Sequence, residues 1–280
     1  MKHFLLLGVG LMIAGAANAA LPTGASAPSR LLSGDNGLMA PVWSPSGDMI
    51  AATGDNYSGI YVARADGSYM RQISSDAGAG YQMMWNDNAT IVGRAALNQN
   101  GGRRYALRSY NVADGRTADL STGRELPRVA KKQGAASLYE NMLAHPAGIT
   151  SAVPALSRFA GKMVINPAEN ADGTKIAFQV PGQGMWVINA DGSGLRSLGN
   201  GSHPAWLPDG DTLVYTLVSD NGADFTASVL FALDTKTNRT VTLTSQTGMI
   251  PLTPAVSPDG SKVAFENAAD HAIYVINLKY

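Results

Sequence analysis

The chain has 280 residues, with 21 basic and 21 acidic side chains, 45% hydrophobic residues, 31 glycines, 14 prolines and no cysteine. The hydrophobic fraction is enough for a packed core, which argues against a disordered chain, and the balanced charge argues against binding to nucleic acid or to anionic lipid. The lack of cysteine excludes disulfides, thiolate metal sites and cysteine nucleophiles, and the many glycines and prolines favour tight turns over long helices.

Residues 1–19 predict a secretory signal peptide. Lys2 precedes an apolar run over residues 4–17, and Ala17, Asn18 and Ala19 form the small-x-small pattern of a cleavage site. The alternative is a membrane anchor, but the run is shorter than the roughly 20 residues that a spanning helix needs. We therefore expect an exported protein, periplasmic or extracellular, with no membrane span, whose mature part is residues 20–280.

Four stretches of the mature part repeat one pattern: a short apolar strand, a tight turn rich in Pro, Asp and Gly, and a second apolar strand. They are residues 41–51, 169–178, 204–215 and 254–265, with a weaker copy at 84–92. Proline fixes φ early in such a turn, aspartate caps it and glycine adopts positive φ. A third and a fourth apolar strand follow the pattern, as at 185–189 and 195–198. Four antiparallel strands in roughly 40 residues predict a blade of a β-propeller.

The spacing of the turns predicts the number of blades. Equivalent turn positions are held by Gly47, Asn88, Gly173, Gly210 and Gly260, and the interval of 85 residues between Asn88 and Gly173 is twice the repeat. We therefore expect a divergent blade there, with its turn at Gly134, and hence an all-β, six-bladed β-propeller with four-stranded antiparallel blades of about 43 residues each. The blades are expected at residues 41–75, 81–120, 126–162, 163–199, 203–245 and 252–280. In a competing interpretation, residues 121–160 are an insertion with a short helix.

The two ends of the mature part predict how the ring closes. The last repeat stops at Tyr280 after its third strand, and residues 29–33 have the fourth-strand pattern without a blade of their own. Pairing of this segment with the last repeat completes the final blade and removes both sheet edges. Trp43, Trp85 and Trp206 share one repeat position, so we expect them to pack between blades rather than to bind a ligand.

The turn and strand sequences resemble those of a known family. Residues 43–47 (Trp-Ser-Pro-Ser-Gly) and 256–260 (Val-Ser-Pro-Asp-Gly), with residues 61–62 and 190–192, look like the repeats of TolB-like (WD40-like) β-propellers. The resemblance covers nearly all of the mature part, is weakest over 121–160, and implies the fold but little about function. Similar repeats form the propeller of prolyl-oligopeptidase-type peptidases, whose Gly-x-Ser-x-Gly motif does not occur here. Oligogalacturonate lyases are similar as well, and they carry a manganese site of clustered histidines.

Residues that differ from one repeat to the next predict a binding surface. In such a propeller the turns between first and second strands lie on one face, here named the turn face. The loops that join second to third strands, and blade to blade, lie on the opposite face around the channel opening, here named the mouth face. Loops on a rigid scaffold often carry binding residues, although polar residues collect in loops of any protein. The residues expected on the mouth face are Asp55, Asn56, Tyr57, Tyr81, Arg103, Arg104, His145, His203, Asp220, Asp224 and His271.

No motif for serine hydrolysis, zinc-dependent hydrolysis or phosphate binding occurs, so we expect no catalytic residue and no cofactor. The sequence favours a monomeric, non-catalytic scaffold that binds a protein partner, or else a glycan, through the mouth face. The alternative is a metal-dependent polysaccharide lyase or hydrolase, because three imidazoles could hold an ion that acidifies a bound water. Its metal ligands would be His145, His203 and His271. A third interpretation is a relative of the peptidases that has kept only the propeller.

Overall fold

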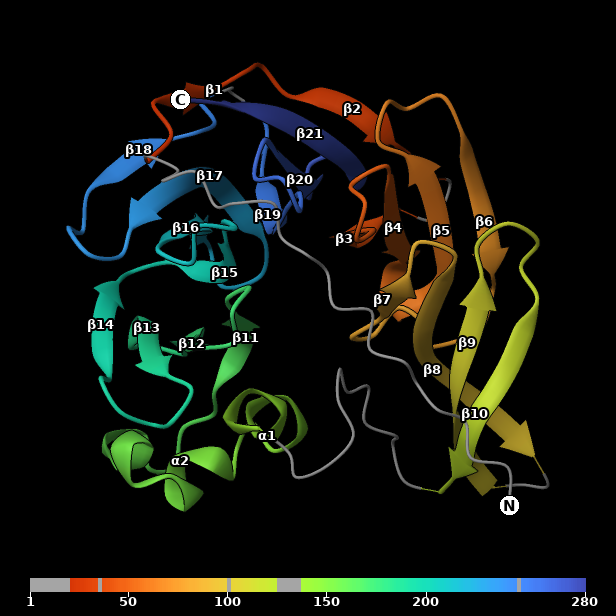
Figure 1. Ribbon diagram of the computed structural model, residues 1–280, viewed down its shortest axis with the longest axis horizontal. Helices are drawn as coiled ribbons and strands as arrows, with labels where there is room; N and C mark the ends of the chain where they lie inside the picture. The colour runs from red at the N-terminus through yellow and green to blue at the C-terminus, as the bar shows by residue number, and fades with distance from the viewer. Residues whose placement is uncertain (1–20, 35–36, 100–101, 125–136, 246–247) are drawn as a thin grey trace.

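The computed structural model of the chain describes residues 21–34, 37–99, 102–124, 137–245 and 248–280. The predicted signal peptide, residues 1–19, lies outside the described residues, as does the predicted turn at Gly134. The described residues form antiparallel sheets arranged around a central axis, with a helical segment at one point of the ring (Figure 1).

Four of the blades are four-stranded meanders, each with its first strand nearest to the axis (Figure 1). The first blade comprises β3 (Met39–Trp43), β4 (Met49–Gly54), β5 (Ser58–Arg64) and β6 (Met70–Ser74). The second comprises β7 (Met84–Asp87), β8 (Thr90–Gln99), β9 (Gly102–Asn111) and β10 (Thr117–Gly123). The third comprises β11 (Ile165–Glu169), β12 (Lys175–Val180), β13 (Gly184–Asn189) and β14 (Arg196–Gly199). The fourth comprises β15 (Ser202–Trp206), β16 (Thr212–Asp220), β17 (Phe225–Asp234) and β18 (Thr240–Thr242).

The closing blade joins the two ends of the described chain. Its strands are β19 (Pro251–Val256), β20 (Lys262–Asn267) and β21 (Ala272–Lys279), together with β2 (Ser29–Leu32) and the short β1 (Gly24–Ala25). Strand β2 pairs antiparallel with β21, with Ser29 opposite Val275 and Leu32 opposite Ile273, and β1 pairs with the far end of β21. The prediction that an N-terminal strand completes the last blade is confirmed.

The prediction of six blades is wrong, because the described residues form five. Where a blade was expected at 126–162, the chain forms α1 (Leu138–Ala144), α2 (Ile149–Ala152) and the 3-10 helix η2 (Pro154–Phe159). A capping box starts α1: the Ser137 hydroxyl accepts a hydrogen bond from the Glu140 amide, and the Glu140 carboxylate accepts one from the Ser137 amide. The long interval between Asn88 and Gly173 therefore arises from the long strands β8 and β9 and from a helical segment. This agrees with the competing interpretation of an insertion with a short helix.

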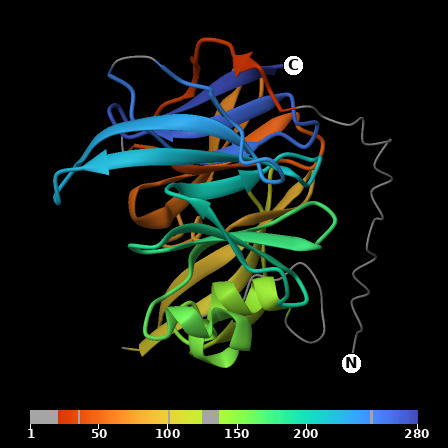
Figure 2. The same ribbon diagram turned by 90° about the vertical axis from the view of Figure 1, so that its left-hand side faces the viewer.

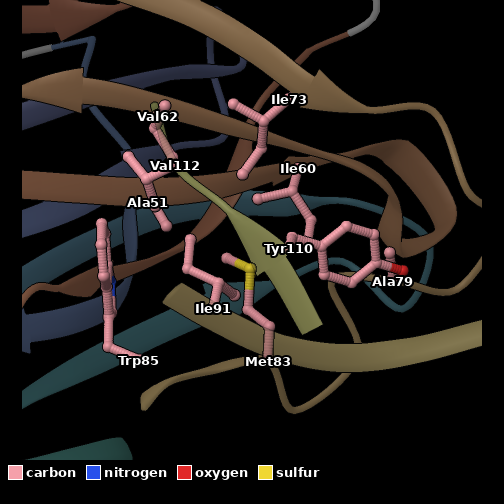
Figure 3. Close-up of a cluster of buried hydrophobic side chains, with 10 residues drawn as sticks. All are labelled: Ala51, Ile60, Val62, Ile73, Ala79, Met83, Trp85, Ile91, Tyr110 and Val112. Atoms are coloured by element: carbon pink, nitrogen blue, oxygen red, sulfur yellow. The ribbon is translucent and has the colours of Figure 1, made fainter. Parts of the chain in front are cut away.

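A separate hydrophobic core fills the junction between neighbouring blades. Between the first and second blades, Ile60 and Val62 of β5 pack with Ile91 and Tyr110 (Figure 3). The helical segment takes the place of a neighbouring blade beside β11–β14, since residues of α1, α2 and η2 join the core on the face of that sheet. Helices cover this apolar face as well as a sheet would, which is why the third blade tolerates the missing neighbour.

The shared tryptophans link the blades near the axis, as predicted. The indole Nε1 of Trp43 donates to the Ala255 carbonyl oxygen at 2.9 Å, that of Trp85 to Val42 at 3.1 Å, and that of Trp206 to Ala168 at 2.9 Å. Each bond runs from the first strand of one blade to the first strand of the preceding blade. The ring is therefore connected by the same side chain at three of its junctions.

The mouth face differs from blade to blade in the length of its hairpins. Strands β4, β12 and β20 have six residues each, whereas β16 and β17 have nine and ten, and β8 and β9 have ten each. The additional residues extend the β16–β17 hairpin beyond the body of the ring (Figure 2). The connection between β4 and β5 contains a short 3-10 helix, η1 (Asp55–Tyr57).

Candidate functional site

One backbone distortion recurs at the first strand of every blade: it lies within the strand in four blades and just before β7 in the second. A single residue there adopts a left-handed conformation, with φ between 50° and 55° in four blades and 45° in the closing one. In four blades this residue directly precedes proline, and the register of the strand shifts beside it. A left-handed residue before proline is unusual, because proline restricts its predecessor to extended backbone. The five bulge residues are Ala40, Gln82, Asn166, His203 and Thr253.

Three of the five bulge residues are paired with polar side chains from the second strand of the same blade. The Arg94 guanidinium donates to Gln82 Oε1 at 2.9 Å, and Asn166 Nδ2 donates to Gln179 Oε1 at 3.1 Å. In the closing blade, the Thr253 hydroxyl donates to Glu266 Oε2 at 2.8 Å. The bulge residues therefore share one backbone conformation, whereas their side chains differ from blade to blade.

Among the bulge residues with polar side chains, His203 is the one for which the described residues supply no such partner. Its Nδ1 is buried, and no hydrogen-bonding group of the described residues reaches it. Burial lowers the pKa of His203 to about 4, so the imidazole is neutral near pH 7. The bulge position of the fourth blade thus carries a neutral imidazole rather than a cation.

Glu266 connects the closing blade to the first blade. Its Oε2 accepts hydrogen bonds from the Thr253 hydroxyl and from the Ala40 amide, the latter at 3.2 Å. Burial raises the pKa of Glu266, and the negative charge of Asp55 adds to this effect, whereas the two hydrogen bonds and His271 oppose it. The carboxyl group is therefore held at the junction where the ring closes.

Two tyrosines extend the site from this carboxylate to the second blade. Burial raises the pKa of Tyr57, with smaller contributions from Tyr81 and from Glu266. The Tyr57 and Tyr81 rings meet edge to face with centroids 5.0 Å apart, and the Arg94 guanidinium carbon lies 5.1 Å from the Tyr81 centroid. The two aromatic rings and the Arg94 guanidinium thus form a continuous set of contacts on the mouth face, close enough to Glu266 for its charge to act on Tyr57.

A polar pocket of about 620 Å³ opens between the first blade and the closing blade. It is formed by connections of the mouth face and by residues of β5 and β6, so it lies away from the channel axis. Its size is within the range of small-ligand sites. The lining residues are Gly37, Gly54, Asp55, Ser58, Tyr61, Gln72, Ser75 and His271.

The structure brings some of the predicted residues together and separates others. Asp55 and His271 share the pocket, and Tyr57 contacts Tyr81 beside it. Asn56, in the same 3-10 helix, is exposed. The remaining predicted residues lie elsewhere: Arg104 on β9, His145 at the end of α1, His203 in β15, Asp220 at the end of β16 and Asp224 in the turn that follows; the side chain of Arg103 is outside the described part.

The three histidines of the metal hypothesis occupy different elements. His145 is exposed after α1, His203 is in the first strand of the fourth blade, and His271 joins β20 to β21. Among the described residues, no three side chains of the kinds that bind metals lie close enough to share an ion. The structure therefore offers no geometric support for a metal at these positions.

Glu266, Arg94 and Gln82 were not predicted as site residues. Glu266 and Arg94 lie within strands that the repeat predicts to be apolar and buried. Gln82 lies outside the repeated strand–turn–strand pattern. An alignment of the repeats would have revealed part of this signal, because in four blades the residue before the proline of the first strand differs from blade to blade. Gln82 does not precede proline, so only its position in the repeat marks it.

Structural comparisons found similar solved proteins of low sequence identity. The structure is similar to an oligogalacturonate lyase from Vibrio parahaemolyticus, with a TM-score of 0.48 and 13% identity over 88% of this chain and 79% of the lyase. It is also similar to TolB from Acinetobacter baumannii, with a TM-score of 0.37 and 13% identity over 88% of this chain and 56% of the TolB chain. No family model matches the sequence, and no curated protein matches it. The structural neighbours thus include TolB-like propellers, as the repeat predicted, and at this identity they describe the fold alone.

Proposed function

We propose that the chain is an exported, non-catalytic propeller scaffold that binds a protein partner on its mouth face. The observation that carries the proposal is the exposure of large apolar side chains there. Leu217 and Phe225 of the projecting hairpin are 44% and 48% exposed, and Tyr81, in the connection to the second blade, is 40% exposed. Exposed apolar groups on a rigid frame are typical of protein-binding surfaces.

The frame itself supports such a role. The ring closes on β2, and four junctions between blades each have their own core, so the loops are positioned before a partner arrives and lose little conformational entropy on binding. The predicted export directs the search for a partner to the cell envelope or the medium. None of the helices in the described ranges is long and apolar enough to cross a membrane.

The test compares the two faces. The purified protein is immobilised and used to capture partners from an envelope fraction, alongside the double variant Leu217→Ser/Phe225→Ser. The control is Tyr69→Ser, which removes a side chain of similar exposure, 43%, in the turn that joins β5 to β6 on the turn face.

We expect the captured partner to bind at least tenfold more weakly to the double variant and unchanged to the control, because the transfer of two such side chains out of water contributes about 1.5–3 kcal/mol each when burial is complete. Equal loss in both variants, or in neither, would contradict the assignment of binding to the mouth face.

A further inference from the structure

The pocket between the first and closing blades exists only because the ring closes. Gly37 comes from the connection between β2 and β3, Asp55 from η1, and His271 from the connection between β20 and β21. A Cβ atom at Gly37 would lie 3.0 Å from the His271 Cβ and 3.1 Å from Asp55 Oδ1, so the backbone of this glycine lies between the two side chains. Segments far apart in the sequence are thus brought to one small site.

The backbone around this pocket is strained in a way that the repeat does not explain. Nine residues other than glycine have positive φ in the described ranges. Five are the bulge residues, and Asn238 lies in the turn between β17 and β18. The other three are Asn56, Tyr57 and His271, with φ of 56°, 56° and 52°. Left-handed backbone costs roughly 1–2 kcal/mol per residue, and such strain gathers at functional sites.

The pocket presents hydrogen-bond acceptors. The Asp55 carboxylate has no hydrogen-bond donor and no cation beside it among the residues that the structure describes, unlike Asp209 and Asp259, which cap backbone amides of their turns. The Gln72 amide nitrogen donates to the Ser74 carbonyl oxygen at 3.0 Å, which leaves its oxygen to accept. Hydroxyl groups of Ser58, Tyr61 and Ser75 complete the lining.

The charge of the site is negative. No lysine or arginine is among the lining residues, and the Glu266 carboxylate lies near enough to Asp55 for the two to repel each other. An anionic ligand would meet this carboxylate with no lysine or arginine to neutralise it and with the His271 imidazole as the one basic group of the lining, and a neutral saccharide would supply no counter-charge. A primary ammonium group carries three donors, no acceptor and a positive charge, so it matches both the acceptors and the charge.

We propose that this pocket binds the side-chain ammonium group of a lysine that the protein partner presents. The identity of the lysine as part of a protein partner rests on the proposed function. The affinity for an ammonium group is inferred from the lining residues of the pocket alone. Asp55 forms the ion pair, and the hydroxyl and amide oxygens accept the remaining N–H groups. Because the pocket is beside the Tyr57–Tyr81 pair, one partner segment can contact the aromatic rings and insert its lysine in the same binding event.

The test titrates the full protein with acetyl-Gly-Gly-Lys-Gly-Gly-amide and follows the backbone amide signals of Asp55, Ser58 and His271 by NMR. The peptide with norleucine in place of lysine keeps the aliphatic chain without the charge. Asp55→Asn is the site variant, and Asp66→Asn, which changes an exposed carboxylate in the turn between β5 and β6 on the turn face, is its matched control. n-Butylamine and maltotriose serve as the free amine and the neutral saccharide.

We expect saturable shifts with the lysine peptide, at least tenfold weaker binding to Asp55→Asn, no change with Asp66→Asn and no binding of the norleucine peptide. Binding of maltotriose in place of the lysine peptide would overturn the proposal. Butylamine binding as tightly as the peptide would overturn the assignment to a partner's lysine in favour of a free amine. If no partner is captured on the mouth face but the lysine peptide still binds at Asp55, only the proposed function is refuted.

Discussion

On the turn face, neighbouring blades contact each other through turns of similar sequence. On the mouth face, the connections between strands differ in length and in sequence. Turn glycines Gly47, Gly173, Gly210 and Gly260 all have φ between 68° and 77°. A Cβ atom at Gly47 would contact Pro258 of the closing blade, and one at Gly210 would contact Asn170 of the third blade. On the mouth face, hairpin lengths vary, and a carboxylate, an imidazole and two tyrosines occupy positions that occur once.

This difference shows how a repeat protein separates stability from recognition. Every blade needs the same turn and the same inter-blade contacts, so residues there are constrained by packing. The mouth face needs only connections that reach the next strand, so its residues are free to serve a ligand. The following three changes test this separation, in order of expected effect.

The largest effect is expected at the shared tryptophan of the closing junction. Trp43 is 7% exposed, and its indole donates to Ala255. Trp43→Ala should lower the free energy of unfolding by about 3–5 kcal/mol, because it leaves a cavity and an unpaired carbonyl. Urea unfolding measures this loss. Trp43→Phe retains most of the ring and should lose less; equal losses in the two variants would show that the hydrogen bond, not the packing, holds the junction.

An intermediate, pH-dependent effect is expected at His203. Its folded pKa of about 4 is below the ordinary value of 6.5, so the unfolded chain binds the additional proton between these two values. The free energy of unfolding should therefore be highest above pH 6.5 and fall by up to about 3 kcal/mol as the pH drops to about 4. His203→Asn, which copies the bulge residue of the third blade, should remove this dependence from urea unfolding curves.

His271→Asn is the control for that experiment. It changes an exposed histidine on the same face that also has positive φ. If the two variants change the pH profile equally, the buried environment of His203 is not the cause.

The smallest of the three effects is expected at one turn. Gly210 has φ of 68°, and a Cβ there would lie 3.1 Å from Asn170 Nδ2. Gly210→Val should lower the free energy of unfolding by about 1–3 kcal/mol, since a β-branched residue is strained in left-handed backbone. Gly210→Asn should lose less, because asparagine tolerates this conformation. Thermal unfolding distinguishes the two, and a neutral Gly210→Val would mean that the turn does not require glycine.

The fold was largely predictable and the blade count was not. Turn residues and alternating apolar strands are local signals, so they identified four blades and the weaker copy at Trp85. Between Asn88 and Gly173, the interval was attributed to a sixth blade because it equals two repeats. The capping box at Ser137 and Glu140 was a local sign of a helix, but length alone could not show that helices cover the third blade.

The candidate site was only partly predictable, because local signals show the face on which a residue lies but not which residues on that face are neighbours. Asp55, Tyr57, Tyr81 and His271 were expected on one face, because the topology assigns their connections to it. Which of them meet depends on the position of each blade around the ring. His145, for example, follows a helix where a blade was expected, and it lies apart from the other two histidines.

By itself, the sequence determined the strands, the turns and the side of the ring on which each connection lies, since these follow from residues close together in the chain. Only the tertiary structure decided that five sheets and a helical segment complete the ring, and that Gly37, Asp55 and His271 form one pocket. The physical reason is that this pocket requires β2 to pair with β21, a contact between opposite ends of the described chain. The left-handed backbone at Tyr57 and His271 is likewise visible only in the folded structure.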